Sequence, residues 1–369
     1  MKWGRLARPL YPPKPMKKIR VLVADDSALM RQTFKRIITA SADFDLVGLA
    51  RDGEDVVSKA RELRPDVISM DINMPKLDGI TALQIILHEK ICPVVMVSSL
   101  TQQGTSTTFE CLELGAFDFV AKPDGTVSSN LGSVANELTS KLRAAANRGV
   151  VDRTQRTRER RQPYQAPVRN TFENNTRMRA IAIGISTGGP ATLQEVLPQI
   201  PADLPASIFL VQHMPPSFIA SFAKRLGDSC AIKVVEARSG MSVEPSICYV
   251  APGGMHLCLH RKMTGEIVIR TPTTPATLFV PSVGVMMESV LKVYGPDTVG
   301  VLMTGIGDDG ADQMVAIRNA GGHTIAESEQ TAVVYGMPRE AIERGGACVV
   351  APSHQVAGEI LRTVRRTIQ

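Results

Sequence analysis

The chain is organised around residues 181–190, which read IAIGISTGGP. A run of small and β-branched apolar residues ends at Ser186, two glycines and a proline follow, and a helical pattern begins at Ala191. This order predicts a strand, a tight turn and a helix, with the Ser186 hydroxyl presented at the turn. The spacing Gly184-x-Ser186-x-Gly188 matches the nucleophile-elbow pattern, in which a sharp turn exposes a serine oxygen. A purely structural or phosphate-binding turn has the same spelling, so the pattern alone does not decide between them.

Length and composition predict a multidomain protein with apolar cores. A chain of 369 residues with 44% hydrophobic residues predicts two or three domains. No apolar run reaches the roughly 18 residues of a membrane span, so we expect no membrane insertion. The six cysteines form no Cys-x-x-Cys pair. We therefore expect buried thiols in a reducing compartment, the cytoplasm, and neither a disulfide framework nor a zinc site.

The first fifteen residues are basic and rich in proline and contain no apolar core of a secretory signal. Met16 directly precedes the first strand-like run. Residues 1–15 are therefore interpreted as a disordered extension, or as a segment upstream of an alternative start.

Arginine is concentrated between residues 143 and 179, where acidic residues are few, although the net charge of the chain is only +6. This stretch also contains prolines and few apolar residues, so we expect a solvated linker. Nucleic-acid binding is the alternative, but the stretch lacks interleaved aromatic residues and no nucleic-acid partner is expected. The predicted domains are residues 17–143 and 180–369, joined by a linker over residues 144–179.

Strand-like runs alternate with helical patterns through the first domain, which predicts a parallel sheet with helices on both faces. Polar residues follow the strands at the carboxyl edge, where such sheets bind ligands. Any one of these residues could simply cap a strand, but together the carboxylates would repel one another unless a cation such as Mg²⁺ lay between them. The lysine and the serine could then hold a phosphoryl group accepted by one aspartate. The set is Asp25, Asp26, Asp71, Ser98 and Lys122.

These motifs resemble the receiver domain of two-component response regulators. The residues that carry the resemblance are Asp25-Asp26-Ser27, Asp71-Ile72-Asn73-Met74-Pro75, Gly79, Ser98 and Lys122-Pro123. The resemblance implies a flavodoxin-like fold with a five-stranded parallel sheet and phosphorylation at Asp71. It also implies Mg²⁺ held by Asp25, Asp26, Asp71 and the Asn73 carbonyl, a switch formed by Ser98 and Lys122, and a cis Lys122–Pro123 bond.

Alternation resumes in the second half and predicts a second doubly wound α/β domain. The expected strands are 180–185, 208–212, 247–250, 299–303 and 348–350. Residues 256–260 and 267–270, separated by Thr264-Gly265, predict an antiparallel hairpin.

His213 is the histidine that the pattern places at the same sheet edge as Ser186, because it ends the strand 208–212. The other five histidines are interpreted as surface or capping residues. The strand after residue 299 opens into a glycine-rich turn that contains Asp308 and Asp309. A carboxylate there could orient the histidine ring, although spacing does not decide which aspartate does so. Phosphate binding by this turn is disfavoured by its two carboxylates.

The three motifs resemble the protein-glutamate methylesterase of bacterial chemotaxis, the CheB family. They are residues 184–189 (GISTGG), 212–216 (QHMPP) and 303–310 (MTGIGDDG), with residues 251–256 (APGGMH) in addition. The order Ser, His, Asp departs from the Ser, Asp, His order of α/β-hydrolases.

The resemblance implies Ser186 as nucleophile, His213 as base and Asp309 as orienting acid. It places oxyanion donors near Thr187 and Ile306. At the position of Ile306 the family often has methionine. It further implies an esterase without a cofactor, glutamine deamidation as a second activity, methyl-accepting chemoreceptors as substrates and a chemotaxis histidine kinase as phosphodonor. The unphosphorylated receiver is expected to cover the edge that carries Ser186.

Two alternatives stay open at the level of sequence. One is a response regulator with a non-enzymatic output, and the other is a triad hydrolase of an unrelated small substrate. A receptor esterase that serves a system other than swimming has the same sequence features.

Overall fold

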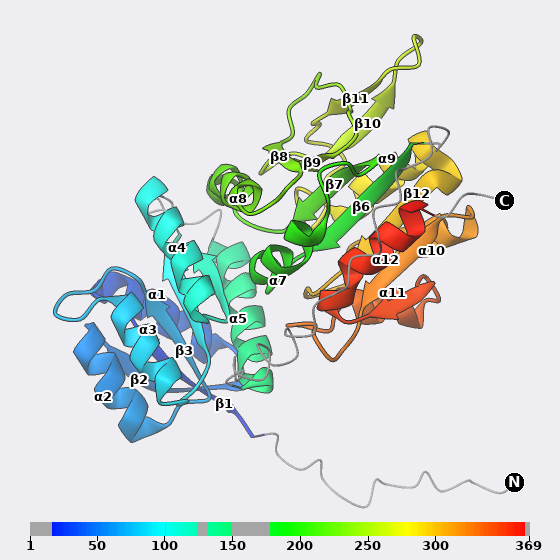
Figure 1. Ribbon diagram of the computed structural model, residues 1–369. Helices are drawn as coiled ribbons and strands as arrows, with labels where there is room; N and C mark the ends of the chain where they lie inside the picture. Colours follow the sequence, from blue (N-terminus) through cyan, green and yellow to red (C-terminus); the bar gives the residue numbers. More distant parts are fainter. Residues whose placement is uncertain (1–16, 100, 124–130, 150–177, 366–369) are drawn as a thin grey trace, which may run out of the picture.

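The computed structural model describes residues 17–99, 101–123, 131–149 and 178–365, which form two α/β domains (Figure 1). The expected N-terminal extension, residues 1–15, lies outside the described residues. So do residues 150–177, and helix α5 (Leu131–Arg148) extends into the stretch predicted as linker. The predicted boundary between the first domain and the linker, at residue 143, therefore stays a prediction.

The first domain has a five-stranded parallel sheet in the order β2-β1-β3-β4-β5. Helices alternate with the strands, as the sequence predicts, and the flavodoxin-like fold is confirmed. Its elements are β1 (Ile19–Ala24), α1 (Ala28–Ala40), β2 (Phe44–Ala50), α2 (Gly53–Leu63), β3 (Val67–Asp71), α3 (Gly79–His88), β4 (Val94–Ser98), α4 (Gln102–Leu114), β5 (Asp118–Ala121) and α5.

Local chemistry explains where the helices of this domain begin. The side chains of Ser27, Asp52 and Asp78 each accept a hydrogen bond from the backbone three residues ahead, which satisfies an N–H group that the first turn leaves free. The central strand β3 is buried along its whole length, as expected of a parallel strand covered on both faces. The edge strand β2 is only partly buried, and its weak apolar pattern escaped the sequence analysis.

The Lys122–Pro123 bond differs from the expectation. Among the described residues the cis bonds precede Pro275 and Pro281, so the expectation of a cis bond before Pro123 is wrong for this structure. The trans form of an X–Pro bond is favoured by about 0.5–1 kcal/mol unless the surroundings require cis. Lys122 reaches its carboxylate partners from the trans form.

The second domain has a seven-stranded sheet in the order β14-β13-β12-β6-β7-β9-β8, together with the separate hairpin β10-β11. Neighbouring strands of the large sheet pair in parallel and the hairpin is antiparallel, which confirms the predicted fold class. Its elements are β6 (Arg179–Ile185), α7 (Gly189–Val196), η1 (Leu197–Gln199), β7 (Ala206–Gln212), α8 (Pro216–Asp228), β8 (Lys233–Glu236), β9 (Ile247–Val250), β10 (Cys258–Arg261), β11 (Ile267–Arg270), α9 (Val283–Tyr294), η2 (Gly295–Asp297), β12 (Thr298–Leu302), α10 (Ala311–Asn319), β13 (His323–Glu327), α11 (Met337–Glu343), β14 (Val349–Ala351) and α12 (Ser353–Arg365).

The strand order places a switch point at β6. The chain moves from β6 to β7 on one side and later returns to β12 on the other side. Helices α9, α10 and α11 pack on one face of the sheet, and α7, α8 and α12 pack on the other. Loops that follow β6, β7 and β12 therefore converge at one carboxyl edge, where doubly wound sheets bind their ligands.

Aromatic rings join the two domains. Phe109 of α4 and Phe119 of β5 pack against Phe218 and Phe222 of α8, with ring centroids 4.5–6.2 Å apart for the three closest pairs across the boundary. All four side chains are at most 4% exposed. In Figure 1, α4 and α5 lie next to α7 and α8, while the hairpin β10-β11 projects from the far side of the second domain. The first domain thus packs on the face of the second domain that carries α7 and α8.

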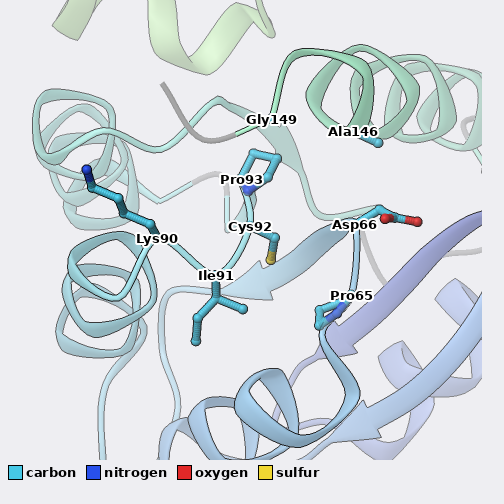
Figure 2. Close-up of a pocket in the computed structure, with 8 residues that line it drawn as sticks. All are labelled: Pro65, Asp66, Lys90, Ile91, Cys92, Pro93, Ala146 and Gly149. Carbon is cyan, nitrogen blue, oxygen red and sulfur yellow. The ribbon is translucent and has the colours of Figure 1, made fainter. Parts of the chain in front are cut away.

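A cavity of about 430 Å³ opens in the first domain beside the starts of β3 and β4 (Figure 2). Its lining includes Asp66, Lys90 and Cys92. Burial raises the pKa of the Cys92 thiol to about 12, so the sulfur stays protonated and unreactive. This end of the sheet is opposite the carboxyl edge, and we assign the cavity no chemical role.

Two further expectations concern cysteines and the membrane. All six cysteines are free, although Cys348 is exposed and only Cys92, Cys111 and Cys248 are fully buried. Across the described ranges, no helix is both long and apolar enough to cross a membrane.

Candidate active site and phosphorylation site

Ser186 directly follows β6 and begins the turn into α7. Its N–H donates to the Thr304 carbonyl at 2.9 Å, and its own carbonyl accepts from the Gly189 N–H at 2.8 Å. Gly188 has φ +76°, and a Cβ there would lie 2.4 Å from Val333. Glycine is therefore required by both backbone conformation and space. The predicted strand, turn and helix are present as expected.

The loop after β12 comes very close to this turn. A Cβ on Gly305 would lie 2.8 Å from the Ser186 Cβ. The Ser186 side chain is only 8% exposed. Gly305, in the motif of residues 303–310, is thus what allows the two loops to meet.

His213 follows β7, the strand next to β6. Its ring lies against Asp309, in the loop that follows β12. The His213 Nε2 and the Asp309 Oδ2 are 2.9 Å apart. Within the described residues, the other ring nitrogen, Nδ1, is buried and has no hydrogen-bond partner. Phe279 stacks on the ring with a centroid separation of 4.3 Å and an interplanar angle of 15°. The ring is therefore held on one edge and one face, and Nδ1 is left available.

Spacing left two aspartates open, and the structure brings Asp309, the one that the resemblance implies, to His213. Asp309 bonds to His213, whereas Asp308 is largely exposed and pairs with Arg344. The Asp309 side chain, from the loop before α10, lies at the N-terminus of α9 and accepts four hydrogen bonds from the described residues. Besides His213, the donors are the Ser282 hydroxyl and the N–H groups of Val283 and Gly284.

These donors control the charge of Asp309. Burial raises the pKa of its carboxyl, but the hydrogen bond and charge of His213, with the N–H groups of Gly284 and Val283, outweigh burial and lower the pKa below its usual 3.8. The free N–H groups at a helix N-terminus favour a negative charge, and the Asp309 carboxylate lies at such an end. Asp309 is therefore a fixed carboxylate.

The sequence analysis missed the role of His256. It was interpreted as a surface or capping residue, but its side chain is fully buried. Its Nε2 lies 2.9 Å from the Pro275 carbonyl and its Nδ1 accepts from the Ser282 N–H at 3.1 Å. His256 thus holds the loop that supplies Ser282 to Asp309 and Phe279 to His213. Its place in the APGGMH motif was the only available signal.

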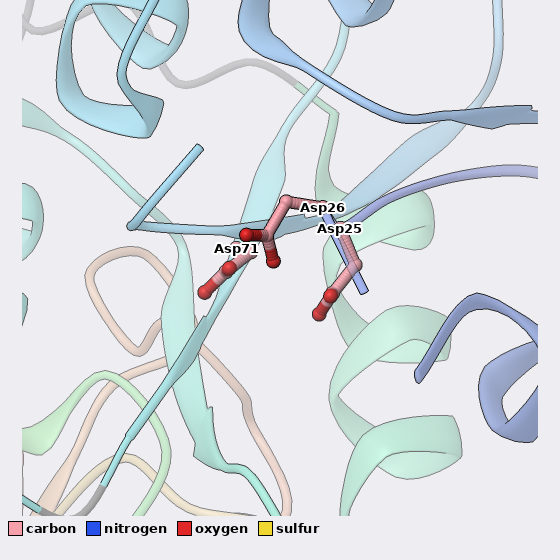
Figure 3. Close-up of side chains that lie close together, drawn as sticks. All are labelled: Asp25, Asp26 and Asp71. Carbon is pink, nitrogen blue, oxygen red and sulfur yellow. The ribbon is translucent and has the colours of Figure 1, made fainter. Parts of the chain in front are cut away.

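The first domain has a second candidate site. Asp25, Asp26 and Asp71 each offer a carboxylate oxygen, and these oxygens all lie within 4.8 Å of one another (Figure 3). Lys122 Nζ is 2.9 Å from both Asp25 and Asp71. Oxygen ligands at this spacing fit a small hard cation such as Mg²⁺.

Burial and charge shift the titration of this cluster in opposite directions. Burial raises the pKa of Asp71, with a further contribution from Asp25, while Lys122 and the Asn73 N–H lower it less than these raise it. Burial lowers the pKa of Lys122, but Asp25 and Asp71 outweigh it and raise the pKa above its usual value. Lys122 therefore carries the positive charge that partly neutralises the carboxylates.

The Ser98 hydroxyl points toward α4. It accepts a hydrogen bond from the Thr108 hydroxyl at 2.7 Å and lies 3.3 Å from the Gly104 carbonyl. Ser98 is therefore positioned between the acidic cluster at the strand ends and the helix that contacts the second domain.

One hydrogen bond links the first domain to the turn that carries Ser186. The Asp118 Oδ2 of β5 accepts a hydrogen bond from the Gly188 N–H at 3.2 Å, two residues after Ser186. Asp118 is buried beside Lys141, whose Nζ also contacts Glu137. Burial lowers the pKa of Lys141, but the charges of Asp118 and Glu137 outweigh it and raise the pKa above its usual value. A carboxylate of the first domain is thus held on the turn that carries Ser186.

Comparison with known families accounts for both domains. Residues 21–127 match the family model of the response regulator receiver domain, and residues 181–360 match that of the CheB methylesterase. An enzyme domain follows the receiver, so the alternative of a non-enzymatic output is wrong.

Similar proteins align with this chain over nearly their whole length. Protein-glutamate methylesterase/protein-glutamine glutaminase 3 of Syntrophomonas wolfei is 58% identical over 356 residues, which cover 94% of this chain and 100% of that protein. The protein-glutamate methylesterase/protein-glutamine glutaminase of Caldanaerobacter subterraneus is 50% identical, over 94% of this chain and 97% of that protein.

Among solved structures, the Thermotoga maritima CheB methylesterase catalytic domain is 35% identical and aligns with a TM-score of 0.49, over 50% of this chain and 98% of its own. The near-complete coverage of the Syntrophomonas and Caldanaerobacter proteins shows the family without reference to that alignment. The chain therefore belongs to the protein-glutamate methylesterase/protein-glutamine glutaminase family, with a receiver domain and a CheB methylesterase domain.

Proposed function

We propose that this protein hydrolyses glutamate methyl esters on methyl-accepting chemoreceptors with a Ser186-His213-Asp309 triad, under control of phosphorylation at Asp71. The observation that supports the triad most strongly is the His213–Asp309 hydrogen bond at the sheet edge that carries Ser186. The family of its relatives supports the substrate class.

The reaction is a two-step acyl transfer. His213 Nδ1 takes the proton of Ser186, and the serine oxygen attacks the ester carbonyl of the substrate. His213 returns the proton to the leaving methanol, and water then hydrolyses the acyl-enzyme by the same proton transfers in reverse. A general base contributes about 10²–10⁴-fold to the rate. No cofactor is required by these steps.

Backbone N–H groups stabilise the negative oxygen of each tetrahedral intermediate. The candidates are the N–H of Thr187, at the start of the α7 turn, and the N–H of Ile306 in the facing loop. Removing one such donor costs about 3–4 kcal/mol in other enzymes. A glutamine amide at the same carbon follows the same path and releases ammonia, so glutamine deamidation is the second proposed activity.

Methanol release from methylated chemoreceptors tests this function. We expect the full-length protein, supplied with Mg²⁺ and acetyl phosphate, to release methanol and to convert receptor glutamines to glutamates by mass spectrometry. A protein that removes no methyl groups under these conditions would falsify the proposed function.

The receiver site is proposed to accept a phosphoryl group at Asp71 from a chemotaxis histidine kinase in the cytoplasm. Asp25, Asp26, Asp71 and the Asn73 carbonyl would hold Mg²⁺, which neutralises phosphoryl charge when bound. Lys122 and Ser98 are proposed to bind the phosphoryl oxygens. The clustering of the three carboxylates around Lys122 supports this assignment.

Regulation is proposed to act through the contact between the domains. The receiver contacts the turn that carries Ser186 through Asp118, which accepts from the Gly188 N–H. It also packs on α8 through the rings of Phe109 and Phe119. This arrangement supports a restricted state of the unphosphorylated protein. Phosphorylation would shift the population toward an open state.

Charge reversal at the rim of this contact is expected to activate the enzyme. Glu113 of α4 pairs with Arg225 of α8 at 2.5 Å and is exposed. Glu113→Lys places two cations together, so we expect higher basal methanol release and a smaller gain on adding acetyl phosphate. Wild type should gain about 5- to 150-fold, the range of typical allosteric coupling.

Glu110→Lys is the matched control, since Glu110 is exposed on the same helix and should leave both values unchanged. Equal activity of wild type with and without acetyl phosphate, together with an inert Glu113→Lys, would contradict the regulatory proposal.

A further inference from the structure

We propose that Gln212 is a positioning residue for the esterase reaction, because its side-chain amide fixes the peptide group between Ser186 and Thr187 relative to His213. This inference rests on the proposed function. Gln212 contacts no substrate in this proposal. It acts by orienting the backbone N–H of Thr187, one of the two candidate oxyanion donors.

Gln212 joins the two loops that carry the nucleophile and the base. It is the last residue of β7, in register with Ile185 of β6, and is 2% exposed. Its Nε2 donates to the Ser186 carbonyl at 3.0 Å and to the His213 carbonyl at 2.8 Å. Both partners are acceptors, so only the NH₂ group of the amide can face them.

The Ser186 carbonyl controls the direction of the next N–H. A peptide group is planar and trans, so the Thr187 N–H points opposite to the Ser186 C=O. Two donors, Gln212 Nε2 and the Gly189 N–H, hold that carbonyl. Without Gln212, only the Gly189 N–H would restrain the plane of the peptide group between Ser186 and Thr187.

The following peptide group is held by a different residue. Thr304 Oγ1 donates to the Thr187 carbonyl at 2.8 Å and accepts from the Val334 N–H. The Thr304 N–H in turn donates to the buried Glu327. Successive peptide groups after Ser186 are thus fixed from opposite sides, by Gln212 of the β7 edge and by Thr304 of the β12 edge.

The other end of the Gln212 amide argues against a purely structural role. Within the described residues its Oε1 is buried without a hydrogen-bond donor. It also fills the space next to Gly189, where a Cβ would lie 2.0 Å from it. A buried acceptor without a donor is unfavourable for stability, and an apolar side chain of the same length would avoid it. The amide is therefore explained by its two N–H bonds, to the Ser186 and His213 carbonyls of the catalytic loops.

Gln212→Met tests the inference because methionine has a similar length and no N–H group. In the full-length protein with Mg²⁺ and acetyl phosphate, we expect kcat for methanol release from methylated chemoreceptors to fall about 10- to 100-fold. This is less than the 10²–10³-fold expected when an oxyanion donor is removed outright. KM should stay within about twofold, since the lost interaction acts in the transition state.

A buried hydrogen bond in the same sheet provides the control. Thr324 of β13 accepts from the Cys348 N–H at 2.9 Å and is fully buried, on a strand that carries none of the catalytic residues. Thr324→Val should lower the melting temperature and leave kcat unchanged. A Gln212→Met protein with wild-type kcat, or with a change in KM alone, overturns the inference.

Gln212→Glu provides a second readout that a structural role would not change. The ionised carboxylate cannot donate to the two carbonyls, but the protonated form can donate one hydrogen bond. The ratio of its kcat to that of wild type should therefore rise as pH falls, whereas the Gln212→Met ratio stays flat. A flat ratio for Gln212→Glu contradicts the inference even if Gln212→Met fails to fold. Failure of the proposed function is distinct, because wild type itself would then release no methanol.

Discussion

Replacing Ser186 with alanine is expected to lower kcat for methanol release by about 10⁴- to 10⁶-fold, as removal of the nucleophile does in other serine hydrolases. The substitution leaves no oxygen to form the acyl-enzyme. The residual rate comes from water attack on an ester that the oxyanion donors still polarise. The fold should be unaffected, because the backbone N–H and carbonyl of Ser186 keep their bonds to Thr304 and Gly189. Single-turnover methanol release and a melting curve measure both quantities.

Ser207→Ala is the matched control for this experiment. Ser207 is a fully buried serine near the start of β7, at the opposite end of the strand from Gln212 and His213, and its hydroxyl donates to the Glu244 carbonyl. Its loss should affect stability and leave kcat unchanged. If Ser186→Ala kept its rate within about tenfold of wild type, a general base acting on water would replace the covalent mechanism.

The second large effect is expected from Asp309→Asn, with kcat lower by about 10⁴-fold. An amide NH₂ facing His213 Nε2 would leave the proton of the neutral ring on Nδ1, the nitrogen that is proposed to accept the proton of Ser186. Turned the other way, the NH₂ group would face the N–H of Gly284 and the hydroxyl of Ser282, which are donors in the native site. Neither orientation preserves both the tautomer and the loop.

Asp309→Asn should also change the dependence of stability on pH. The folded protein lowers the pKa of Asp309 below 3.8, so the ionised carboxylate stabilises the fold above that value. This contribution is lost as pH falls below 3.8 through the folded pKa. The melting temperatures of wild type and variant should therefore differ by a constant amount above about pH 5 and converge in acid.

Asp308→Asn separates these effects from a general loss of charge in the loop. Asp308 is adjacent in sequence but exposed, and its partner is Arg344. We expect nearly wild-type kcat and stability. Equal losses from both substitutions would contradict the assignment of Asp309 as the orienting acid.

Strand runs and polar residues at their ends were sufficient to predict that each domain has a parallel sheet and which edge carries each site. Apolar runs such as 208–212 are buried because parallel strands are covered on both faces, and the following residue must then lie at the carboxyl edge. The strand β8 escaped prediction because its four residues are mostly half-exposed. Residues 323–327 also escaped prediction, although this short strand is buried.

The Ser186 turn shows where sequence reasoning stops. Sequence by itself determined that a serine, a histidine and a pair of aspartates follow strands of one parallel sheet, because local apolar patterns set the strands and their ends. Spacing left Asp308 and Asp309 open and the family resemblance implied Asp309; the tertiary structure shows the contact of Asp309 with His213 itself. Only the tertiary structure decided that His256 is buried behind this pair and that Gln212 and Asp118 hold the turn. Those contacts join loops far apart in the chain, and their distances depend on strand order, loop packing and the donors at the start of α9, none of which is encoded in local spacing.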